Sequence, residues 1–139
     1  MNKLYLDSDV ILDLLLDREP FADSISDLIE TALDRNVQLF TSPISITNIY
    51  YIIEKLENRN QALTKTKKVL ELVKIEGVGQ STIDEAIKSS FIDFEDGVQN
   101  FCAAHAGHKI IITRNGKDYK TSTLSILTPG EYLAQLNAQ

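Results

Sequence analysis

Three groups of acidic and amide side chains occur in this chain, each close to the end of an apolar run or to the start of a helical pattern. Carboxylates that lie within a few ångströms of one another repel, and a bound divalent cation relieves that repulsion. Ligation by oxygen alone favours Mg²⁺ or Mn²⁺, and a metal held in this way can activate water and bind a phosphate oxygen. The groups are, in chain order, Asp7 with Asp9; Asp93 with Glu95 and Asp96; and Asn115 with Asp118.

The local pattern predicts which elements position these groups. The first group follows residues 3–6, a short apolar run typical of a strand, and helical apolar spacing begins directly after it. The third group follows residues 109–113, a continuous β-branched run typical of a buried parallel strand. The second group opens a helix predicted from Phe94 to Ala106, with Asp93 as its N-cap. If the two strands are neighbours, their carboxyl ends bring the groups together.

Strands and helices alternate along the whole chain. This alternation predicts a single domain over residues 1–139, an α/β fold with three α/β/α layers around a central parallel sheet of four to five strands. The other predicted strands are 37–41, 73–78 and 125–127, and the other predicted helices are 10–18, 22–33, 45–57, 61–72, one starting near residue 83 and one starting at residue 129.

Composition limits the class of function. The net charge of −6 does not suggest a nucleic-acid-binding protein, because phosphate affinity usually comes from Lys and Arg; bound divalent metals would reverse the local field. Cys102 is the only cysteine, which excludes an intramolecular disulfide and a cysteine-rich zinc site. No run is long enough to span a bilayer and no signal peptide is visible, so we expect a cytoplasmic protein with no membrane partner.

Ordinary structural roles compete with metal binding for several of the acids. A helix cap is the simplest explanation of Asp93, a solvent-facing position that of Glu95, and a turn that of Asp118. Asp9 falls in the first helix, where a surface or capping role is the alternative. The acids least explained by local structure are Asp7 and Asp96.

The segments around these acids resemble the PIN domain, the nuclease fold of VapC-type toxins. Residues 5–15 are similar to the family's opening strand and helix, which places Asp7 at the family's invariant acid. Residues 96–107 are similar to the family's helix that begins with an acid, here Asp96, and ends with a glycine. The strand and loop at 111–119 match the family's pattern almost residue for residue, and residues 125–133 resemble its usual C-terminal ending.

Three positions depart from the family's pattern. Asn48 stands where PIN nucleases usually carry a glutamate, and Asp9 stands where asparagine is commoner. Asn115 stands where many members have an acid. An amide ligates a metal through its oxygen but brings no charge, so the resemblance supports the fold more strongly than it supports catalysis.

The resemblance implies a metal-dependent endoribonuclease that uses Mg²⁺ or Mn²⁺, cleaves RNA, pairs with a small antitoxin and forms a homodimer. It assigns a role to each matching residue. The implied catalytic carboxylates are Asp7, Asp96 and Asp118, which also bind metal; further metal ligands are Asn115, Asp93 and Asp9; supporting residues are Ser8, Asn48 and Thr113; and RNA-binding residues are Arg114, Lys117 and Lys120.

Two other functions stay open at this point. A PIN fold with a weakened acidic set would bind RNA or a protein without cutting. A haloacid-dehalogenase-like phosphatase would explain Asp7-Ser-Asp9 and the pair Thr41-Ser42. That class also needs a flap insertion after the first strand, whereas here the helical pattern begins at once. Response-regulator receivers fit less well, because no acid follows the predicted strand at 73–78.

Overall fold

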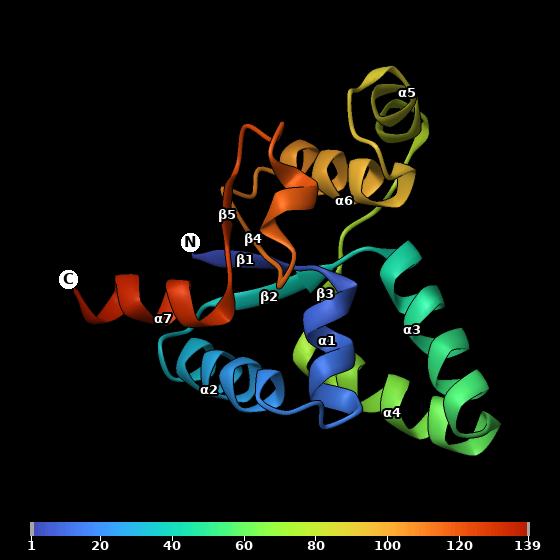
Figure 1. Ribbon diagram of the computed structural model, residues 1–139, viewed down its shortest axis with the longest axis vertical. Coiled ribbons are helices and arrows are strands. Elements are labelled where there is room, and N and C mark those ends of the chain that lie inside the picture. The colour runs from blue at the N-terminus through green and yellow to red at the C-terminus, as the bar shows by residue number, and fades with distance from the viewer. Residues whose placement is uncertain (1, 139) are drawn as a thin grey trace.

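A parallel five-stranded sheet organises the chain. The computed structural model describes residues 2–138 and orders the strands β3-β2-β1-β4-β5 (Figure 1). The predicted parallel sheet is therefore confirmed, with the third strand ending three residues earlier than predicted. The strands are β1 (Lys3–Leu6), β2 (Gln38–Thr41), β3 (Val73–Ile75), β4 (Ile110–Ile112) and β5 (Ser125–Leu127).

The two strands that the acidic groups follow are direct neighbours. β1 pairs with β4 in the register Tyr5↔Ile111 and Leu6↔Ile112. The backbone N–H of Asp7 then donates to the carbonyl of Ile112 at 2.9 Å. The side chains that follow both strands therefore start from adjacent positions at one edge of the sheet.

Helices cover both faces of the sheet (Figure 1). Leu4 and Leu6 belong to the larger core, which includes residues of α1, α2, α3, α4 and α7. Tyr5 points to the other face, where α6 supplies Cys102 and Ala103 and α5 packs against α6. The helices are α1 (Ser8–Leu15), α2 (Phe21–Asp34), α3 (Pro43–Leu56), α4 (Arg59–Leu72), α5 (Gln80–Lys88), α6 (Phe94–His105) and α7 (Pro129–Asn137), and a 3₁₀ turn, η1 (Gly116–Tyr119), follows β4.

Helix capping accounts for where three of these helices begin. Ser42 accepts from the N–H of Ser45 at 3.1 Å and Pro43 fills the first turn, so α3 starts two residues before the predicted 45. Asp93 caps α6 as predicted. The α5 helix starts at Gln80 rather than near 83, with Gly79 as its N-cap.

A buried polar network ties α6 to α3 beneath the acidic groups. The Tyr5 hydroxyl donates to Gln99 Oε1, and Gln99 Nε2 donates to Ser45 Oγ. The Ser42 hydroxyl also lies 3.4 Å from Gln99 Oε1. Because buried amides and hydroxyls are costly to leave unpaired, this network fixes the distance between the two helices. Within residues 2–138 no helix is both long and apolar enough to cross a membrane.

Candidate active site

Asp7 is the most firmly held carboxylate of the site. It is 6% exposed at the end of β1, and its Oδ1 accepts from the N–H of Ser8 at 2.6 Å as the cap of α1. Its Oδ2 accepts from the hydroxyls of Thr113 and Tyr119, both at 3.0 Å. Burial raises the pKa of Asp7 and these hydrogen bonds oppose that rise. Thr113 and Ser8, the predicted supporting residues, therefore both contact the Asp7 carboxylate.

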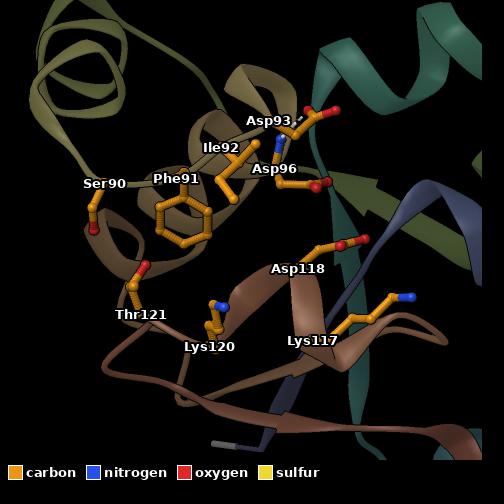
Figure 2. A pocket seen from close by; sticks show the side chains of 9 residues that line it. All are labelled: Ser90, Phe91, Ile92, Asp93, Asp96, Lys117, Asp118, Lys120 and Thr121. Atoms are coloured by element: carbon orange, nitrogen blue, oxygen red, sulfur yellow. Dashed lines mark hydrogen bonds between the residues drawn. The ribbon is translucent and has the colours of Figure 1, made fainter.

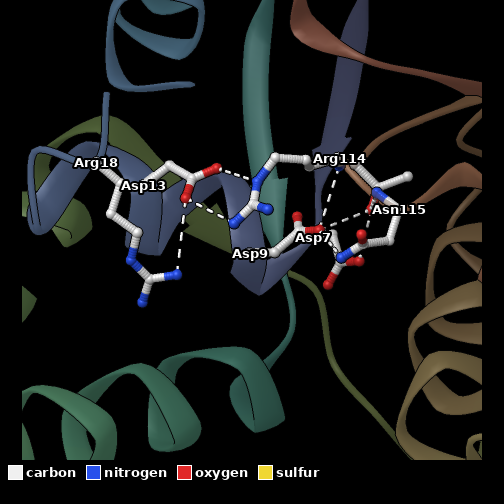
Figure 3. Close-up of polar contacts among 7 residues, drawn as sticks. Asp7, Asp9, Asp13, Arg18, Arg114 and Asn115 are labelled. Atoms are coloured by element: carbon white, nitrogen blue, oxygen red, sulfur yellow. Dashed lines mark hydrogen bonds and ion pairs between the residues drawn. The ribbon is translucent and has the colours of Figure 1, made fainter. Parts of the chain in front are cut away.

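Asp9 shares a hydrogen-bond donor with Asp7. Asp9 Oδ2 lies 3.1 Å from Thr113 Oγ1 and accepts from Asn115 Nδ2 at 2.9 Å (Figure 3). Its buried Oδ1 has no hydrogen-bond partner among residues 2–138. Burial and the charge of Asp7 raise the pKa of Asp9 to about 6. Thr113 has one hydroxyl hydrogen and cannot donate to both carboxylates at once. A proton or a cation is therefore needed to offset the repulsion between Asp7 and Asp9.

Asp96 faces these groups from the first turn of α6. Burial raises its pKa to about 7, assisted by the charges of Asp7, Asp93, Asp118 and Glu95. Asp93, Asp96 and Asp118 line one cavity. In Figure 2 the carboxylates of Asp96 and Asp118 point toward the same space, while Asp93 accepts from the N–H of Asp96 at 3.1 Å. The second and third acidic groups therefore converge as predicted, and Asp93 has its capping role.

Glu95 is part of the site, contrary to the expectation that it faces solvent. It is half-buried and lines a cavity of about 400 Å³ together with Ser8 and Asn48. Its charge also contributes to the raised pKa values of Asp7 and Asp96. The only feature of the sequence that placed Glu95 near the site was its neighbour Asp96. Adjacency in a helix does not indicate which of two successive side chains points inward.

Arg114 is engaged away from the carboxylates of Asp7 and Asp96. Its Nε and Nη2 donate to the carboxylate of Asp13 at 2.8 and 3.0 Å (Figure 3). Its guanidinium also lies 4.1 Å from the ring centroid of Phe21. Lys117 and Lys120 instead line a cavity with the acids (Figure 2). Of the three predicted RNA-binding residues, these two lysines line the cavity of Asp96 and Asp118, whereas the Arg114 guanidinium is paired with Asp13.

The donor set fits a hard divalent cation that keeps part of its water shell. Within residues 2–138 no three His, Cys, Asp or Glu side chains are arranged closely enough to form a ready-made metal cage. Mg²⁺ does not need one, because it binds through one or two carboxylates and several waters. The buried Asp7 and the half-buried Asp96, together with the unpartnered Oδ1 of Asp9, match that requirement.

The raised pKa of Asp96 predicts how metal-free stability depends on pH. The folded state holds a proton between pH 4 and about 7 that the unfolded state releases, so this group's contribution to the free energy of unfolding falls as pH rises through that window. In EDTA, we therefore expect the Tm of the Asp96→Asn protein to increase relative to the wild-type Tm as the pH is raised from 5 to 8. Parallel Tm profiles for the two proteins would contradict the raised pKa.

Comparison with protein-family models identifies the family of this chain. Residues 3–117 match the family model described as the PIN domain. The chain belongs to the PIN domain family. Ribonuclease VapC1 of Aquifex aeolicus (strain VF5) is 28% identical to this PIN domain over 141 residues, which cover 98% of this chain and 96% of that protein.

Solved structures share the fold. VapBC from Salmonella typhimurium bound to DNA matches this PIN domain with a TM-score of 0.74 at 14% identity, over 93% of this chain and 99% of that chain. VapBC2 from Rickettsia felis, bound to a DNA fragment from its promoter, gives a TM-score of 0.73 at 16% identity, over 91% and 98%. The PIN domain also replaces the phosphatase interpretation, because α1 begins at Ser8 and leaves no room for a flap after β1.

Proposed function

We propose that this PIN domain is a divalent-metal-dependent endoribonuclease and the toxin of a toxin–antitoxin pair. The proposal is supported by Asp96 and Asp118 lining one cavity, and by the pKa of Asp96, which burial and the charges of Asp7 and its other acidic neighbours raise to about 7. Perturbed carboxylates of this kind gather where chemistry is performed. The named ribonuclease relative supports the same activity.

The residues of the chain have distinct parts in the proposed reaction. Asp7, Asp96 and Asp118 would hold Mg²⁺ or Mn²⁺, which when bound activates water and neutralises charge on a phosphate. Thr113 and Tyr119 keep the Asp7 carboxylate in one orientation through their hydroxyls. These hydrogen bonds fix Asp7 before substrate arrives, so the site does not need to reorganise during the reaction.

The groups around the three acids would bind substrate and support the ligands. Lys117 and Lys120 attract the RNA backbone toward the acidic edge of the sheet. Asn115 holds Asp9 in place through its amide. Asp9 and Asp93 supply further negative charge, and the amide oxygen of Asn48 is available beside Ser8.

The structural neighbours support the proposal of a partner protein. The similar chains of Salmonella typhimurium and Rickettsia felis are from VapBC assemblies bound to DNA. We propose that this PIN domain pairs with a small antitoxin, forms a homodimer and acts on RNA in the cytoplasm. Inducible expression in a bacterial host tests the toxin role: the wild-type protein is expected to arrest growth, and Asp7→Asn is expected to permit it.

Cleavage of a structured RNA tests the enzymatic proposal. We expect cleavage with Mn²⁺ or Mg²⁺, none with EDTA, and recovery when excess Mn²⁺ is restored. Cleavage that persists in EDTA would refute metal dependence, and cleavage retained in Asp7→Asn would refute the assigned site. A 5′-labelled substrate shows whether the products come from internal cuts or from the ends.

A second function is favoured by one observation, namely the weak ligand set. Asn48 brings no charge and no three acids form a metal cage among residues 2–138. A domain that binds RNA without cutting it would give RNA binding that EDTA does not alter and no product at any metal concentration. The cleavage assay, run beside a binding assay, therefore separates the two functions.

A further inference from the structure

A cavity of about 320 Å³ opens beside Asp96 and Asp118, outside the hydrogen-bonded group around Asp7. Its sides differ in chemistry (Figure 2). Phe91 and Ile92 form an apolar side, and Lys120 lies between Thr121 and Asp118 on the side facing them. One site thus offers an apolar surface, hydroxyl groups and a positive charge beside the acids.

The apolar side of this cavity is fixed to the acidic site. The ring of Phe91 packs edge-on against Tyr119, with centroids 5.9 Å apart, and Tyr119 in turn donates to Asp7. Gly97 lets the loop lie against α6, because a Cβ at this glycine would come within 3.3 Å of Phe91 Cβ. A group bound against Phe91 would therefore be held at a set position relative to Asp7.

Two features of the cavity residues indicate that the cavity binds a ligand. The side chain of Ile92 is 97% exposed, so it contributes almost nothing to the core. Neither Lys117 nor Lys120 forms an ion pair with another residue in the range 2–138. A ligand with a flat apolar part would cover Ile92, and its negative part would pair with a lysine. A nucleotide has that composition.

We propose that this cavity binds the base of one unpaired nucleotide of the RNA, next to the phosphate that the acids act on. The inference rests on the proposed function and extends it to substrate class. Lys120 contacts the phosphate of that nucleotide, and Phe91 with Ile92 contacts its base. The volume lies at the lower end of the range for ligand sites, so it suits one nucleotide. A base inside a duplex is stacked and paired, and therefore cannot enter.

Binding of a fluorescent single-stranded RNA to the Asp7→Asn protein, which prevents cleavage, tests the site. Ile92→Glu and Lys120→Glu in that background are each expected to weaken binding by about tenfold, the first through loss of the base contact and the second through loss of the phosphate contact. The matched controls are Ile87→Glu, which is 67% exposed on α5, and Lys109→Glu, which is exposed at the opposite end of β4. Binding by the cavity variants equal to binding by the controls would overturn the proposal.

A second probe isolates the contribution of the base. A strand of the same length with abasic riboses should bind more weakly than the RNA, and Ile92→Glu should not weaken it further. A fully paired duplex should bind as weakly as the abasic strand. Equal effects of Ile92→Glu on both strands would show that the added charge, not the base contact, is responsible.

The outcomes separate this inference from the proposed function. Base-dependent binding without cleavage by the unsubstituted protein would retain the nucleotide site and refute the nuclease. Normal cleavage by Ile92→Glu and Lys120→Glu proteins, with Asp96→Asn inactive, would retain the nuclease and refute the nucleotide site.

Discussion

Replacing Asp96 by asparagine is expected to reduce the rate of RNA cleavage by on the order of a thousandfold, the cost of removing one preorganised charge-stabilising group. The substitution keeps the shape of the side chain, replaces one acceptor oxygen by an NH₂ donor, and removes the charge that Asp7, Asp93, Asp118 and Glu95 repel. Mn²⁺ affinity should fall together with the rate. Single-turnover cleavage and calorimetric Mn²⁺ titration measure the two effects on the same protein.

Asp93→Asn is the matched control for that experiment. Asp93 caps α6 by accepting from the N–H of Asp96 at 3.1 Å, and asparagine is an equally good N-cap. This variant therefore removes a neighbouring charge while keeping the helix start, and we expect less than a tenfold change in rate. If Asp93→Asn lost as much activity as Asp96→Asn, overall negative charge rather than ligation at Asp96 would explain the result.

The sequence predicted those parts of the site that depend on local pattern. A short apolar run located β1 and a continuous β-branched run located β4. Parallel strands bring their carboxyl ends to one edge, which is why Asp7 and Thr113 meet. The cap of α6 at Asp93 was predictable for the same reason, because capping is a local interaction.

The parts that escaped prediction depend on contacts between residues distant in the chain. Gln99 was not singled out, although it bonds Tyr5 and Ser45 in the core. The two departures from the family's pattern at Asp9 and Asn115 are 106 residues apart, and the structure joins them in one 2.9 Å hydrogen bond. No local pattern indicates that a carboxylate at one of these positions is held by an amide at the other.

Arg114 shows most clearly how a distant partner changes an expected role. Its place after β4, beside the acids, predicted RNA contact, yet its guanidinium pairs with Asp13 on α1 and covers the Phe21 ring. Asp13 is 1% exposed, so removal of Arg114 would leave a buried carboxylate without its main partner. The structure therefore favours a role for Arg114 in stability over a direct role in binding.

Arg114→Met is accordingly expected to lower the free energy of unfolding by about 3 kcal/mol, because it leaves a buried carboxylate without its main partner. Arg18 compensates only in part, since its Nη1 lies 3.7 Å from Asp13 Oδ1. Urea denaturation of the metal-free protein measures this change. Lys117→Met, at an exposed position of the turn η1, is the control and should leave the stability nearly unchanged.

A second substitution at Asp13 distinguishes lost pairing from lost packing. If the cost of Arg114→Met comes from the unpaired carboxylate, the double variant Asp13→Leu/Arg114→Met should recover most of the stability, because a buried ion pair replaced by apolar side chains is often neutral or better. If the double variant is no more stable than Arg114→Met, packing of Arg114 on Phe21 carries the effect. If Arg114→Met instead keeps full stability and raises KM for RNA, the guanidinium leaves Asp13 to bind substrate, and the sequence-based prediction is correct.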